Sequence, residues 1–186
     1  MFRSNKLFVY AIAFAVCSVW ASQPRFAVAD PPPNPGGLTP TEAAARSQAI
    51  DEYYLGAAPA LDAASLAISN ANSYFVSIES LEPDCNARGI AFPDLTPYED
   101  ESDNLNDAMT AATGLANLGD GSVGTGDGET TSSGLRQAAY TLARNQYESS
   151  KDGANTVESN AVDLDGELAF IHIGLQQAIW DYDSQF

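Results

Sequence analysis

The chain has 186 residues and a formal net charge of −17, with 25 acidic residues against eight basic ones. Such a polyanion repels nucleic acid and anionic lipid, so partners of either kind are excluded. His172 is the single histidine. Metal sites and catalytic groups that need two histidines are therefore excluded as well.

The N-terminus has the pattern of an export signal. Arg3 and Lys6 precede an uncharged apolar run at 7–21, and small residues follow it. Cleavage fits after Ala21 or after Ala29, and we predict the second position because a proline run follows it. An uncleaved membrane anchor is the alternative. The run is shorter than the ~20 apolar residues that span a bilayer, which favours cleavage.

Cleavage after Ala29 would divide the chain into a signal peptide at 1–29, a proline-rich linker at 30–38 and a helical-bundle domain at 39–186. All 25 acidic residues but only five basic ones follow the signal, so the exported protein would carry a net charge of about −20. We expect it in the periplasm, at the cell surface or in the medium, with no integral membrane span. Cys85 would be its single cysteine. That excludes an internal disulfide and leaves an inert thiol or an intermolecular disulfide.

Two capping boxes followed by proline mark helix starts. Thr39 is followed by Glu42 three residues later, and Thr96 is followed by Glu99 in the same way. The first box predicts a short helix that ends near Gly56. Its inward face would consist of Ala43, Ser47, Ile50, Tyr54 and Ala57.

Longer helices would follow at about 59–81 and 97–118, with similar lengths that suit antiparallel neighbours. The stretch 119–134 contains six glycines and predicts a mobile loop, because glycine loses the most conformational freedom on folding. Beyond it we expect two helices divided near Gly153, or one long helix kinked there. No alternating β pattern of useful length is present. We predict an all-α fold, an antiparallel four-helix bundle with an additional short N-terminal helix.

The last helix, at about 163–182, has apolar residues on two sides. One stripe follows steps of three and four and would face the core. Its members are Leu164, Leu168, Ile171, Leu175, Ala178, Ile179, Tyr182 and Phe186. On the opposite side, Phe170, Ile173 and Trp180 form a second cluster, which a helix on the surface of a monomeric bundle would not normally carry. We predict that these three side chains lie at an interface with another chain.

Candidate ligands for a cofactor or metal are few. A histidine between two isoleucines is more typical of a packed residue than of a ligand, yet Met109 and His172 could ligate haem iron if they faced each other. Asp120, Asp127 and Glu129 could supply oxygen ligands to calcium, but they lack the alternation of an EF-hand. We therefore predict no cofactor.

No motif for an active site is present. The sequence lacks a Gly-x-Ser-x-Gly elbow, and its paired carboxylates are neighbours on exposed helix faces rather than opposed groups in a cleft. We expect a non-enzymatic protein that acts through self-association or through binding to an envelope component. The alternative is a ligand carrier, a bundle that holds haem, a metal ion or a small apolar molecule between its helices.

Overall fold

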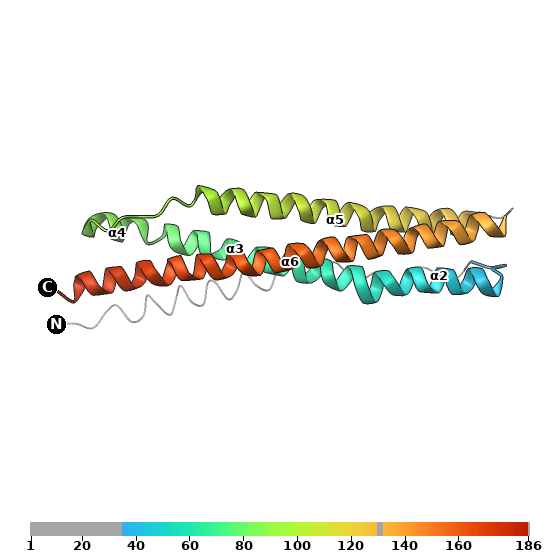
Figure 1. Ribbon diagram of the computed structural model, residues 1–186, viewed down its shortest axis with the longest axis horizontal. Coiled ribbons are helices and arrows are strands. Elements are labelled where there is room, and N and C mark those ends of the chain that lie inside the picture. The colour runs from blue at the N-terminus through green and yellow to red at the C-terminus, as the bar shows by residue number, and fades with distance from the viewer. Residues whose placement is uncertain (1–34, 130–131, 186) are drawn as a thin grey trace.

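The computed structural model describes residues 35–129 and 132–185, and all regular secondary structure within them is helical. The all-α prediction is confirmed. The predicted signal peptide and most of the linker lie outside these residues. The elements in chain order are α2 (Pro40–Glu52), the π-helix η2 (Tyr53–Ala57), α3 (Ala58–Glu79), α4 (Glu82–Arg88), α5 (Thr96–Gly128) and α6 (Ser133–Asp183) (Figure 1).

The first helix begins where the capping box places it. The Thr39 hydroxyl accepts a hydrogen bond from the Glu42 amide at 3.3 Å, and the Glu42 carboxylate accepts one from the Thr39 amide at 2.6 Å. Its predicted end near Gly56 is wrong, because α2, η2 and α3 follow one another without a break. The wider π-helical turns come directly before Pro59, whose ring would clash with the carbonyl four residues earlier in a regular α-helix.

The π-helix also changes which residues face the core. In α2 the buried residues are Glu42, Arg46 and Ala49, which is a different face from the predicted apolar one. The buried pattern resumes at Ala57, the last residue of η2, eight residues after Ala49 instead of seven. The π-helix absorbs the extra residue, so that both halves of the rod keep contact with the same neighbour.

α5 and α6 are both longer than predicted. α5 continues through the glycine-rich stretch to Gly128, which corrects the loop predicted at 119–134. α6 is a single helix of 51 residues, about 76 Å long at 1.5 Å per residue. The short α4, whose C-cap is Gly89 with a positive φ of 66°, lies in the connection between α3 and α5.

Three long rods result, and α6 is the central one. It packs extensively against α5 and against α2, η2 and α3, whereas α3 and α5 meet each other much less. α6 runs parallel to the first rod and antiparallel to α5 (Figure 1). The four-helix bundle is not confirmed, because the first two predicted helices form one rod and the last two form one helix.

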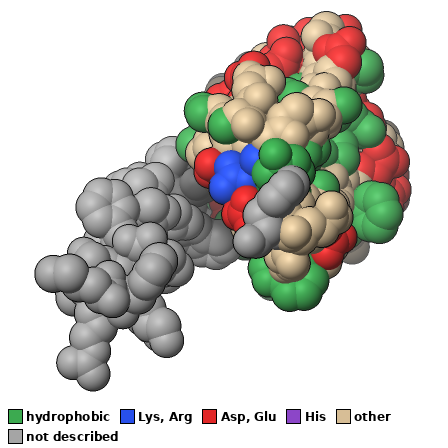
Figure 2. All heavy atoms as spheres, turned by 90° about the vertical axis from the view of Figure 1, so that its left-hand side faces the viewer, with side chains coloured by type: hydrophobic (Ala, Val, Ile, Leu, Met, Phe, Trp, Pro, Cys, Tyr) green, Lys and Arg blue, Asp and Glu red, His purple; other side chains and the backbone are tan. Residues whose placement is uncertain are grey.

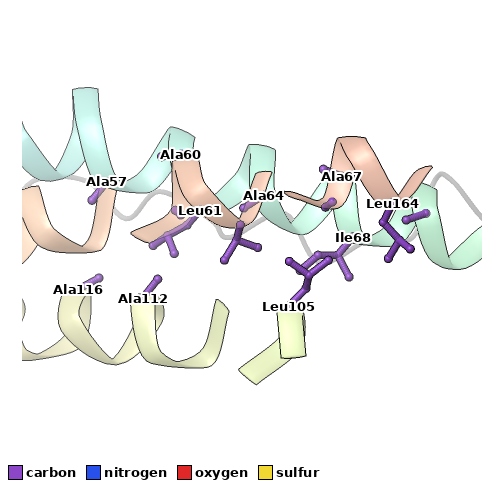
Figure 3. Packing of buried hydrophobic residues seen from close by; sticks show 14 of the residues in the cluster. Ala57, Ala60, Leu61, Ala64, Ala67, Ile68, Leu105, Ala112, Ala116 and Leu164 are labelled. Atoms are coloured by element: carbon purple, nitrogen blue, oxygen red, sulfur yellow. The ribbon is translucent and has the colours of Figure 1, made fainter. Parts of the chain in front are cut away.

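The core is a seam of small side chains. In α6 the buried residues recur at steps of three and four from Tyr140 to Leu168, and Leu175 follows seven residues later, the pattern of a coiled coil. Figure 3 shows Ala57 of η2 and Leu61 of α3 on the side facing Ala112 and Ala116 of α5, with Leu105 against Ile68. Small residues let the helices approach closely. None of the helices described is long and apolar enough to cross a membrane.

Candidate functional site: the outer stripe of α6

The C-terminal part of α6 extends beyond the start of α5 (Figure 1). Phe170, Ile173 and Trp180 lie in this part and are 80, 62 and 64 % exposed. Their spacing of three and seven residues places them on one face of the helix, with Gln177 at the position between. We call Phe170, Ile173 and Trp180 the outer stripe. The structure therefore brings all three predicted interface residues together on one surface.

A separate stripe of α6 forms the core. Leu164, Leu168 and Leu175 are almost fully buried, and Ile171 and Ile179 pack against the cluster they belong to. The outer stripe contributes nothing to that core. Its exposure therefore needs an explanation other than folding of the chain itself.

Two contacts fix the orientation of this end of α6. The Arg88 guanidinium of α4 donates hydrogen bonds to the Asp183 carboxylate at 2.8 and 3.0 Å. The ring of Tyr74 in α3 lies edge-on to the ring of His172, with centroids 5.9 Å apart. Because both contacts hold the inner side of the helix, the outer stripe is turned toward solvent.

The surface around the outer stripe is acidic. From 152 to 185 the sequence contains seven carboxylates and no lysine or arginine. Figure 2, which looks onto this end of the molecule, shows hydrophobic side chains next to acidic ones. Among the residues that the structure describes, Arg88 is the cation with an ion pair to this end of α6, and it contacts Asp84 at 2.8 Å as well as Asp183. Hydrogen bonds to these two carboxylates raise the pKa of Arg88, and Arg88 in turn lowers the pKa of Asp183.

The structure does not bring the candidate haem ligands together. Met109 is half-buried in α5, three residues before Ala112, which lies beside Gly153 of α6. Because the two helices are antiparallel, Met109 is level with about residue 156 of α6. His172 is 16 residues further along α6, or about 24 Å. The two side chains cannot ligate one iron atom.

The candidate calcium ligands belong to contacts between helices. The Tyr147 hydroxyl donates a hydrogen bond to Asp120 at 2.6 Å, and the Tyr140 hydroxyl donates one to Asp127 at 2.8 Å. Asp120 and Asp127 are seven residues apart on one helix, about 10 Å, and do not converge. Glu129 follows the last residue of α5, and its backbone carbonyl accepts a hydrogen bond from Arg136 of α6. The described residues contain no group of three or more potential ligands that could hold a metal ion.

A polar cluster joins α2, α5 and α6 at the other end of the molecule. Arg46 donates to both oxygens of Asp127 at 2.8 and 2.9 Å, and its side chain is only 6 % exposed. Burial alone would raise the pKa of Asp127, but hydrogen bonds from Arg46 and Tyr140 lower it. Burial and the bond to Asp127 raise the pKa of Tyr140 to about 12. The pKa of Glu42, beside Arg136, is lowered by the Thr39 hydrogen bonds.

The sequence carried a signal for these contacts that hydrophobic periodicity misses. The dipeptide Gly-Asp occurs at 119–120 and again at 126–127, and Tyr140 and Tyr147 are also seven residues apart. In the structure each tyrosine ring lies over one glycine and bonds the following aspartate. A Cβ on Gly119 would lie 2.4 Å from Tyr147 Cε1, and one on Gly126 would lie 2.5 Å from Tyr140 Cε1.

Cys85 is fully buried in α4. Burial also raises the pKa of its thiol, which lowers the reactive thiolate fraction. The structure therefore does not present the thiol to a second chain, and an intermolecular disulfide would require α4 to open.

An open groove of about 690 Å³ is lined by residues of α5 and α6. Its floor consists mainly of small side chains, including Ala108, Ala111 and Gly153, with Asp100 and Glu101 at one end. No cation or histidine lines it. It offers neither an enclosed apolar cavity nor an arrangement of opposed acid and base groups.

Comparison of the chain with models of known protein families, with curated proteins and with solved structures gives no match.

Proposed function

We propose that this chain is a non-enzymatic, extracytoplasmic protein that acts by associating with another chain through the outer stripe of α6. The observation that carries the proposal is the stripe itself: three large apolar side chains, each more than 60 % exposed, on one face of the longest helix. The sequence supports the location through its export signal. No cofactor is part of the proposal.

The size of the outer stripe supports a contact. Large aromatic side chains carry about 150–250 Å² each, so the observed exposures leave roughly 400 Å² of apolar surface in one place. That is as large as the largest apolar patch of a typical monomer, which is often functional. Covering this area would contribute about 10 kcal/mol before the costs of association are subtracted.

The shape of the stripe favours a helical partner. Apolar side chains at positions i, i+3 and i+10 on a helix match the seam of a neighbouring helix. Because α5 begins short of this part of α6, a partner helix would cover a stretch of α6 that packs within the chain on α3 and α4. The partner would be either a second copy or an envelope component.

The test is the native size of the protein in extracts of cells that export it. The chain is compared with a variant that carries Phe170→Ser, Ile173→Ser and Trp180→Ser. A matched control carries Leu135→Ser and Leu142→Ser, which are 60 and 52 % exposed on the same helix but far from the stripe. A rod about 76 Å long elutes earlier on gel filtration than a globular protein of the same mass. The elution volume of the unsubstituted chain is therefore compared with that of the variants and not with globular standards.

We expect the unsubstituted chain and the leucine control to elute together in a larger complex, and the stripe variant to elute later, with unchanged helicity by circular dichroism. Coelution of all three proteins would refute the proposal.

A further inference from the structure

We infer that the partner on the outer stripe is a basic amphipathic helix, one with apolar residues at steps of three and four and lysine or arginine beside them. The inference rests on the proposed function and adds the chemistry of the partner. It follows from three observations: the negative charges around the outer stripe, the ion pairs that the basic residues form within the chain, and the apolar area that the stripe exposes.

The carboxylates nearest the stripe are exposed. Asp163 precedes Phe170 by seven residues and so lies in line with it, and Glu167 and Asp181 are 14 residues apart along one flank. Asp163 and Glu167 form no ion pair with the described residues. Asp181 accepts a hydrogen bond from Gln177 at 2.8 Å, which leaves its second oxygen for a partner. Cations placed beside an apolar seam would meet all three.

Within residues 35–129 and 132–185, a second copy of the chain has no cation positioned to meet this surface. Four of the five basic residues in the described part form ion pairs within the chain. The fifth, Arg144, is exposed, but it lies 26 residues, or about 39 Å, before Phe170 on α6. Two copies joined by their outer stripes would bring carboxylates against carboxylates, which is unfavourable.

The apolar area of the outer stripe also favours a basic partner over a second copy. Two outer stripes covering each other would bury roughly 800 Å² in total, less than the ~1,200 Å² at which stable interfaces begin. Apolar contact alone is therefore too small for a firm dimer. Attraction between opposite charges can make up the difference for a basic partner, whereas repulsion weakens the contact further for a second copy.

Two glycines make room for the partner. Nothing lies within 4 Å of a Cβ built on Gly166 or Gly174, which are on the outer side of α6. Gly166 is four residues before Phe170, and Gly174 lies between Ile173 and Trp180. Small residues beside large ones let a second helix approach closely while the large side chains reach around it.

The experiment uses three synthetic peptides of about 20 residues, a length at which a helix can form. The first has leucine at alternating steps of three and four and lysine elsewhere. The second replaces every lysine with glutamate, and the third has the composition of the first with the leucines dispersed around the helix. The exported protein is made from a gene with Trp20→Phe, so that Trp180 is the single tryptophan and its emission reports burial of the stripe.

We expect the lysine peptide to shift the Trp180 emission to shorter wavelength at about 0.1 M salt. Its affinity should fall by at least about tenfold at about 1 M salt, where the Debye length is about 3 Å. The glutamate and dispersed peptides should leave the emission unchanged. The pair Glu167→Gln and Asp181→Asn should weaken binding by about five- to tenfold, and the control pair Glu148→Gln and Asp152→Asn, earlier on α6, should not.

Equal binding of the dispersed peptide or of the glutamate peptide would overturn the inference. Light scattering on the protein alone adds a distinct outcome. A dimer that the stripe substitutions abolish would make a second copy the occupant, which overturns the inference but leaves the proposed function standing. If association in cell extracts does not depend on the outer stripe, the proposed function itself is refuted.

Discussion

Replacing Gly119 by alanine should destabilise the protein, although alanine is the better helix former. A Cβ at this position would lie 2.4 Å from Tyr147 Cε1 and 2.7 Å from Cδ1, well below ordinary contact. The ring cannot move aside easily. It is 2 % exposed, its hydroxyl is bonded to Asp120 at 2.6 Å, and its other side meets Tyr53 with centroids 5.1 Å apart.

The magnitude follows from two opposing terms. Overpacking of a core costs about 1–3 kcal/mol, while alanine in place of glycine in a helix contributes about 1 kcal/mol. Because the contact is as short as 2.4 Å and the ring is held in place, the cost lies in the upper part of that range, about 2–3 kcal/mol, and the net loss in the free energy of unfolding for Gly119→Ala is about 1–2 kcal/mol. At Gly121, two residues on, nothing lies within 4 Å of an added Cβ, so Gly121→Ala should raise the free energy of unfolding by about 0.5–1 kcal/mol.

The assay is unfolding in urea, monitored by circular dichroism. The two alanine variants are compared by their midpoint urea concentrations, provided that the free energy of unfolding depends on urea concentration with the same slope in both. A third protein, Gly119→Ala with Tyr147→Leu, tests the cause. It should lose less stability than the sum of its single substitutions, because the smaller side chain makes room for the Cβ. The reasoning is refuted if Gly119→Ala stabilises the protein as much as Gly121→Ala does.

Three further outcomes can be measured. Asp127→Asn should lower the free energy of unfolding at neutral pH by about 3 kcal/mol, because it removes the negative charge that the buried Arg46 cation contacts. Since the folded-state pKa of Asp127 is lowered, the stability difference between this variant and the unsubstituted chain should be complete above about pH 5 and shrink as the pH falls below about 4; a difference that is constant down to pH 2 would contradict the ion pair. Tyr140 has a raised pKa of about 12, so its contribution to stability is present below about pH 10 and is lost as the pH rises toward 12. A spectrophotometric titration should show its ionisation later than that of exposed tyrosines, and Tyr140→Phe should remove that late step. Arg88→Ala should release the end of α6 from α4, which amide hydrogen exchange would detect as faster exchange in residues 176–185 with little change at Leu164; unchanged exchange there would show that the Asp183 contact does not hold the helix end.

Some of the fold could be predicted because its signals are local. The capping box at Thr39 and Glu42 marks the start of α2 by hydrogen bonds within one turn, and the structure contains both of them. Leu164 and Leu168 lie on the opposite face of the helix from Phe170, and this follows from their spacing in the sequence. The outer stripe could therefore be predicted from the sequence. In each case the residues that decide the outcome are neighbours in sequence.

The helix through the glycine-rich stretch could not be predicted in this way. Glycine favours the unfolded chain locally, and the compensating contacts come from Tyr140 and Tyr147, about 14 to 28 residues later in the sequence. The repeat of Gly-Asp at the same spacing as the two tyrosines was the available signal. This repeat indicates a helix only when it is also known that the two tyrosine rings pack against the glycines of that helix, where a side chain would leave no room for them.

The buried face of α2 is a second case. Hydrophobic periodicity selects Ala43 and Ile50, whereas the residues that face the bundle are Glu42 and Arg46. Their burial depends on Asp127 and on the neighbourhood of Arg136, which are far away in sequence. A charged side chain is buried only when its partner is in place, and a pattern based on hydrophobicity has no means to include that partner.

Site-specific photo-crosslinking tests the role of the outer stripe most directly. A photoreactive amino acid is placed at Ile173 or, as the control, at Leu142, and the protein is irradiated inside the cells that export it. Both positions are exposed apolar sites on α6, so the two proteins have equal access to chance contacts. We predict a discrete crosslinked product at position 173 and none at 142. Equal yields at both positions, or no product at 173, would contradict the claim that this face of α6 is where the protein meets its partner.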